Sequence, residues 1–198
     1  MTTESEAAKA VLHRYLVRAR EALLWKLDDL SEYDARRPIV RTGTNLLGLV
    51  KHMALNEGEY LGLVFDRPMA ELAGAFPDDA DPNADMWAAA EESLLSIADL
   101  YRRVWVHADA TIEALDLESQ GLVPWWPEDR RSPTLHAVLV HVIAETNRHA
   151  GHADILREII DGSAGMSAQL SNLPDVDEDY WPDYAQRLES LARQFEGR

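Results

Sequence analysis

Three polar side chains interrupt an apolar helical seam around residue 149. Glu145, His149 and His152 follow one another at steps of four and three residues, which places them on one face of a helix. Apolar residues continue that face on both sides, namely Leu135, Val138 and Val142 before it and Leu156 and Ile159 after it. A carboxylate inside a helical bundle is costly unless it has a partner, and a bound cation would offset the cost. Residues four apart lie close enough to share such an ion.

A second helical segment supplies a third candidate ligand, His52, on a face that also carries Leu49 and Asn56. Two ligands from one helix and one from another is a common arrangement in helical bundles. Two imidazoles and a carboxylate suit Zn²⁺ best, are compatible with Ni²⁺, Fe²⁺ or Mn²⁺, and leave an open coordination position. The pattern therefore predicts one divalent metal held by His52, Glu145 and His149.

The same residues have other interpretations. Glu145, His149 and His152 would also form a buried hydrogen-bond network without a metal, and His152 suits a fourth ligand, a partner of a ligand, or a proton carrier. We expect ordinary surface or core roles for His13, His107 and His136. His141 lies about 12 Å along the helix from His149, too far to share its ion.

Five stretches show the periodicity of helices, and these helices must position the candidate residues. No stretch shows the alternation of polar and apolar residues that is typical of a strand. The stretches are 12–30, 44–65, 87–115, 133–161 and 181–195. Four long amphipathic helices followed by a short one predict an all-α four-helix bundle with an additional C-terminal helix. We expect Thr44 or Asn45 to cap the second helix, and Ser132 with Pro133 to begin the fourth.

Composition narrows the possible functions. The formal net charge is −16, from 35 acidic and 19 basic residues, which argues against binding to nucleic acid or anionic membranes. There is no cysteine, so any sulfur chemistry must use a small-molecule thiol. The acidic start lacks a signal-peptide pattern and no apolar run would span a bilayer, so we expect a cytoplasmic protein.

Two stretches carry a resemblance to a known family. Residues 37–52 resemble the start of the second helix, and residues 141–158 the metal helix, in a branch of the DinB superfamily common in actinobacteria. Pro124-Trp125-Trp126 and Ile160-Asp161-Gly162 extend the match over most of residues 10–162. We therefore expect a DinB-like metal-binding bundle over 1–162, with 163–198 forming a loop and short helix that pack on the same domain.

The resemblance implies a metal held by three side chains and a thiol-dependent activity. Many members use three histidines, whereas mycothiol-dependent maleylpyruvate isomerase looks to use a His–Glu–His set. His52, Glu145 and His149 resemble that set residue by residue. Relatives are often thiol transferases that activate mycothiol or bacillithiol at the metal. The function expected here is a metal-dependent thiol S-transferase acting on an electrophilic substrate.

Further residues receive roles on this hypothesis. Glu57 is a candidate base or orienting carboxylate, with a solvated surface position as the alternative, and His152 a candidate proton carrier. Arg148 and Arg157 are candidates for contacting an acidic cosubstrate, with salt bridges along the helix as the alternative. Trp125 and Trp126 would cover the cavity or simply pack on the end of the bundle.

Two other classes of function stay open. One is a non-catalytic, stress-related metal-binding protein with the site closed by His152. The other is metal-assisted hydrolysis with Glu57 as the base. A homodimer is also possible.

Overall fold

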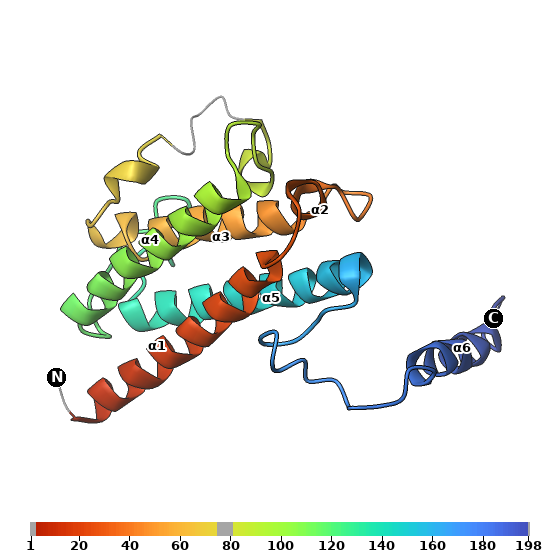
Figure 1. Ribbon diagram of the computed structural model, residues 1–198. Coiled ribbons are helices and arrows are strands. Elements are labelled where there is room, and N and C mark those ends of the chain that lie inside the picture. The colour runs from red at the N-terminus through yellow and green to blue at the C-terminus, as the bar shows by residue number, and fades with distance from the viewer. Residues whose placement is uncertain (1–2, 75–80, 198) are drawn as a thin grey trace.

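The computed structural model describes residues 3–74 and 81–197, and this part of the chain contains helices and no strands. Its elements, in order, are α1 (Thr3–Leu24), η1 (Trp25–Leu27), α2 (Glu32–Arg36), α3 (Leu46–Tyr60), η2 (Leu63–Phe65), η3 (Ala70–Leu72), η4 (Ala84–Met86), α4 (Leu94–Ala114), α5 (Leu135–Asp161) and α6 (Tyr180–Arg193). The four long helices α1, α3, α4 and α5 form the bundle, and α6 is the additional short helix (Figure 1). The expected all-α class is confirmed.

Contacts between three pairs of long helices hold the bundle together. Helix α1 packs chiefly against α5, while α3 packs against both α4 and α5 (Figure 1). Two clusters of buried apolar side chains fill the interior. One includes Leu49, Met53 and Tyr101, and the other includes Leu135 and Val142. Burial of each large apolar side chain stabilises the fold by roughly 1.5–3 kcal/mol.

Glu145 and His149 lie between these two clusters, whereas His52 lies on α3 within the stretch that belongs to the first cluster. On α5, residues 135–142 belong to one cluster and residues 150–156 to the other, which leaves 145–149 at the junction. On α3 the corresponding break falls between residues 54 and 60. The polar interruption of the seam is therefore an interruption of the hydrophobic core.

Helix boundaries differ from the periodicity at several points. The segment 87–93 is not helical, because α4 begins only at the cap Ser93, whose Oγ accepts from Ser96 N–H. Helix α5 begins after Thr134, which caps it through Ala137 N–H, so the predicted cap at Ser132 is wrong. Helices α1 and α3 end earlier than predicted and continue in the 3₁₀ turns η1 and η2. Asn45 caps α3, as expected.

The region after α5 divides into an attached part and a projecting part. Gly162 ends α5 with a φ of 82°, and the carbonyl of Gly165 accepts hydrogen bonds from Trp25 and the buried Lys26. We expected the whole segment 163–198 to pack on the bundle. Helix α6 instead lies apart from it, with no buried residue (Figure 1).

Among residues 3–74 and 81–197, no helix is both long enough and apolar enough to cross a membrane.

Candidate metal centre

Helices α3 and α5 bring the three predicted ligands together. The rings of His52 and His149 contact each other edge to face, with centroids 4.8 Å apart. His149 Nε2 lies 3.6 Å from a carboxylate oxygen of Glu145, one turn earlier on α5. His149 is buried, and the side chains of His52 and Glu145 are 21% and 29% exposed, so the group opens to solvent on one side.

A fourth side chain, Asp85, orients His52. Its carboxylate lies 2.5 Å from His52 Nδ1. An ionised carboxylate only accepts hydrogen bonds, so Nδ1 must carry the proton, and in the neutral ring Nε2 keeps its lone pair for another partner. Metal-binding histidines usually have such a carboxylate or carbonyl at the second nitrogen.

A glycine explains why Asp85 reaches α3. The turn η4, which contains Asp85, packs directly on the first turn of α3. A Cβ atom on Gly48 would lie 1.8 Å from the carbonyl oxygen of Met86, so only glycine permits this approach. Sequence analysis missed Asp85, because it belongs to an acidic connection without periodicity, 33 residues from His52.

His149 carries the clearest sign of an absent partner. Its Nδ1 is buried without a hydrogen-bond partner among the described residues. Burial, and next the neighbouring His52, lower the pKa of His149 to about 4. The ring is therefore neutral at pH 7, which is the form that binds metals.

The donor set fits a divalent metal in the types of its side chains. The imidazoles of His52 and His149 are in contact, a Glu145 oxygen lies 3.6 Å from His149 Nε2, and one imidazole nitrogen has no hydrogen-bond partner among the described residues. Within the described ranges, however, no three His, Asp or Glu side chains converge in an arrangement that would hold an ion as they stand. Liganding by all three would thus require side-chain adjustment.

An aromatic cluster closes the other end of the seam between α3 and α5. Trp125 and Trp126 donate their indole N–H groups to the hydroxyl of Tyr60, at 3.2 and 2.9 Å. His141 contacts the rings of both Tyr60 and Trp126, with centroids 4.6 and 5.3 Å apart. Tyr60 and His141 each lie eight residues from the histidine pair, about 12 Å along their helices. The tryptophans therefore pack at the end of the seam, and Trp125 remains 46% exposed.

Other predicted site residues lie at the edge of the group. His152 is exposed, with its ring centroid 5.5 Å from that of His149. Arg148 is exposed on the neighbouring side of α5. Arg157 is buried, forms an ion pair with Asp161 at 2.7 Å and donates to the carbonyl of Lys26, which is the salt-bridge alternative.

Glu57 occupies neither of its predicted positions. It is fully buried rather than solvated, and its two oxygens accept from Arg20 of α1 at 2.6 and 3.2 Å. Burial raises the pKa of Glu57, against the opposing effect of Arg20. Since its carboxylate is directed at α1 rather than at His52 and His149, we do not propose that Glu57 acts as a base.

Comparison with known proteins identifies the class and then the family. The fold is that of a DinB-like helical bundle, and a crystal structure of a conserved protein from Enterococcus faecalis has a similar fold. The TM-score is 0.59 at 16% identity, and the alignment covers 78% of this chain and 97% of that one. The family model for mycothiol S-transferases matches residues 11–162. The chain belongs to the mycothiol S-transferase family. No curated protein matches it.

Proposed function

We propose that this protein transfers a small-molecule thiol to an electrophile with the help of one divalent metal bound by His52, Glu145 and His149. Membership of the mycothiol S-transferase family supports the thiol chemistry. The observation that carries the metal is the buried imidazole of His149, whose Nδ1 has no partner in the described structure. We favour Zn²⁺ over Ni²⁺, Fe²⁺ or Mn²⁺ because two imidazoles and a carboxylate match its common ligand sets.

The chain's own residues prepare the ligands. Asp85 fixes the proton of His52 on Nδ1 and so directs Nε2 to a cation, while burial keeps His149 neutral. A divalent cation held by these side chains would lower the pKa of a thiol bound to it and would so supply thiolate at neutral pH. The chain has no cysteine, so the nucleophilic sulfur arrives with the cosubstrate, mycothiol or a related thiol such as bacillithiol.

The surroundings would bind and shield the reactants. The aromatic cluster of Tyr60, Trp125, Trp126 and His141 would limit access of water at one end of the seam. His152 and Arg148, both exposed beside His149, would contact the cosubstrate or carry protons.

The experiment is a thiol-consumption assay on protein loaded with Zn²⁺, with mycothiol and a panel of electrophiles. We expect turnover by the wild type and at least a 100-fold loss in His52→Ala and His149→Ala. His136→Ala is the matched control, because His136 is exposed on α5 away from the histidine pair. Metal-loaded protein that consumes no thiol with any electrophile, or variants as active as the wild type, would refute the proposal.

A non-catalytic metal-binding role is the second candidate. The observation that favours it is the ring of His152 beside His149, from which a fourth ligand would close the site. Substitution His152→Ala separates the two functions. Loss of metal affinity supports a closed site, whereas unchanged affinity with altered thiol turnover supports an open one. Hydrolysis is less favoured, because its predicted base, Glu57, pairs with Arg20.

We further propose that helix α6 pairs with its counterpart in a second copy of the chain. Its apolar residues Trp181, Tyr184, Leu188 and Leu191 follow the alternating steps of three and four of a coiled-coil seam, and all are at least partly exposed. Ala185 and Ala192 flank the seam and permit close approach.

Light scattering after size exclusion tests this pairing. We expect a concentration-dependent dimer that Leu188→Asp abolishes and Ser190→Asp, on the outer face of α6, leaves intact. A wild type that stays monomeric at about 100 μM would contradict it.

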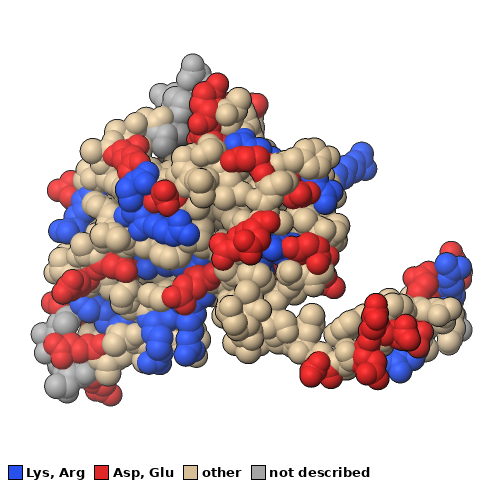
Figure 2. Space-filling view, in the orientation of Figure 1, with Lys and Arg blue, Asp and Glu red and all other residues tan. Residues whose placement is uncertain are grey.

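We expect no nucleic acid partner, given the net charge of −16, and Figure 2 shows Lys and Arg on the visible face of the bundle interspersed with Asp and Glu.

A further inference from the structure

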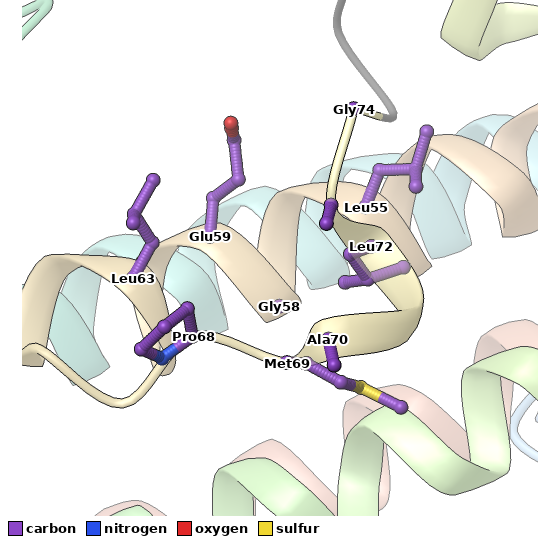
Figure 3. A pocket seen from close by; sticks show the side chains of 10 residues that line it. Leu55, Gly58, Glu59, Leu63, Pro68, Met69, Ala70, Leu72 and Gly74 are labelled. Carbon is purple, nitrogen blue, oxygen red and sulfur yellow. The ribbon is translucent and has the colours of Figure 1, made fainter.

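A cavity of about 490 Å³ lies between α3 and the segment that follows it. Leu55, Glu59 and Leu63 form one wall, and the residues from Pro68 to Gly74 form the other. Figure 3 shows Leu55, Glu59 and Leu63 in a row along one side of the chain, with Met69, Ala70 and Leu72 across from them. The lining is predominantly apolar, and the volume is in the range of pockets that hold small organic molecules.

One carboxylate interrupts this apolar lining. Glu59 is half-buried, and among the described lining residues it is the only ionisable one. It forms no ion pair or hydrogen bond in the described part of the chain, in contrast to Glu71 and Glu92, which pair with Arg103 and Lys51. Arg67, which precedes Pro68 of the lining, donates to the hydroxyl of Thr111 and does not pair with Glu59.

The electrostatic environment of Glu59 favours a cation. Burial raises the pKa of Glu59, and the neighbouring carboxylate of Asp85 raises it further. Asp85 thus adds negative charge to the surroundings of Glu59, and no basic side chain pairs with Glu59 within the described residues. A positively charged ligand head would stabilise the ionised form of Glu59.

The cavity begins close to the candidate metal centre. Leu55 lies one turn after His52 on α3, and Glu59 lies on the same face one turn further, about 10 Å along the helix from His52. Asp85 connects the two places, because it holds His52 and acts electrostatically on Glu59. A molecule with its head at Glu59 would extend toward the histidine pair without leaving this face.

We propose that the cavity binds a small amphiphile whose ammonium head pairs with Glu59 and whose apolar body lies among Leu55, Leu63 and Leu72. Binding in the cavity is independent of the transfer reaction. That the amphiphile is the electrophilic substrate, an apolar molecule with one positive charge, rests on the proposed function. The assignment thereby narrows the substrate class from any electrophile to cationic apolar ones.

The test compares three six-carbon probes by calorimetric titration of the full-length protein at pH 7, without thiol. The probes are n-hexylamine, 1-hexanol and hexanoate, which share the apolar body and differ in the charge of the head. We expect saturable binding of hexylamine, about tenfold tighter than hexanol, and no detectable binding of hexanoate. Hexanoate that binds as well as hexylamine, or no saturable binding of hexylamine, would overturn the inference.

Two variants assign the effect to one residue. Glu59→Gln should weaken hexylamine binding about tenfold and leave hexanol unchanged, whereas Glu91→Gln, an exposed carboxylate outside the cavity, should change neither. Equal binding of hexylamine by Glu59→Gln and wild type would overturn the inference.

A competition assay then tests the substrate assignment. Hexylamine should inhibit thiol transfer competitively with the electrophile in the wild type, and about tenfold less in Glu59→Gln. Protein that transfers thiol but does not bind hexylamine refutes the cavity assignment alone. Protein that binds hexylamine through Glu59 but transfers no thiol refutes the transferase proposal and the substrate assignment, and supports the cavity.

Discussion

Removal of the Asp85 carboxylate should weaken metal binding without unfolding the bundle. The side chain accepts a 2.5 Å hydrogen bond from His52 Nδ1, and both side chains are about one-fifth exposed, so solvent only partly replaces the contact. Without it, His52 is free to rotate and to place its proton on either nitrogen. Loss of such an orienting partner typically lowers metal affinity 10–100-fold, or about 1.4–2.8 kcal/mol.

The assay is competition for Zn²⁺ between the protein and a fluorescent chelator of known affinity. We expect about a tenfold weaker Kd for Asp85→Asn, whose amide oxygen still accepts a hydrogen bond, and a larger loss for Asp85→Ala. Asp81→Asn is the control, because it removes an equal charge from an exposed position near η4. An Asp85→Ala protein that folds normally and binds Zn²⁺ as tightly as the wild type would refute the orienting role.

Three further predictions concern stability. Glu57→Leu alone should cost about 3 kcal/mol in chemical denaturation because it leaves Arg20 in the core with only the part-exposed Asp109 as a carboxylate partner, whereas Arg20→Met with Glu57→Leu should recover much of that loss; additive losses would contradict a buried pair. Gly48→Ala should lower Tm and Zn²⁺ affinity together, since the new Cβ displaces Met86 and with it η4, and unchanged values would refute that packing. Burial lowers the pKa of Lys26, so the unfolded chain binds more protons as pH approaches 10.5 and stability should rise over that window; Lys26→Met should flatten the rise, and an equal slope in both proteins would contradict the assignment.

The sequence predicted the parts of this molecule that depend on local pattern. Steps of three and four residues determine which side of α5 faces the bundle, so His149 was placed correctly beside Glu145. The contact between His52 and His149 was also expected, because His52 interrupts an apolar face of its own helix. Both inferences need only helical geometry and the cost of a buried polar group.

Features that depend on contacts between distant segments of the chain were not predictable. The position of Asp85 follows from the contact between Gly48 and Met86, which joins a connection to a helix without any periodic signal. Glu57 was predicted to be a base, an orienting carboxylate or a solvated surface residue, but its partner Arg20 comes from α1, and a single helix pattern does not show which neighbour faces which side. Helix ends were misplaced where caps such as Ser93 and Thr134 override an apolar pattern that continues beyond them.

The metal content of the purified protein tests the central claim most directly. The protein would be prepared without chelators and without a nickel column, then analysed by inductively coupled plasma mass spectrometry. We predict about one divalent transition metal per chain in the wild type, and less than about one-tenth of that in folded His52→Ala and His149→Ala variants. A wild type that neither contains nor takes up such a metal, or variants that retain it in full, would contradict the account.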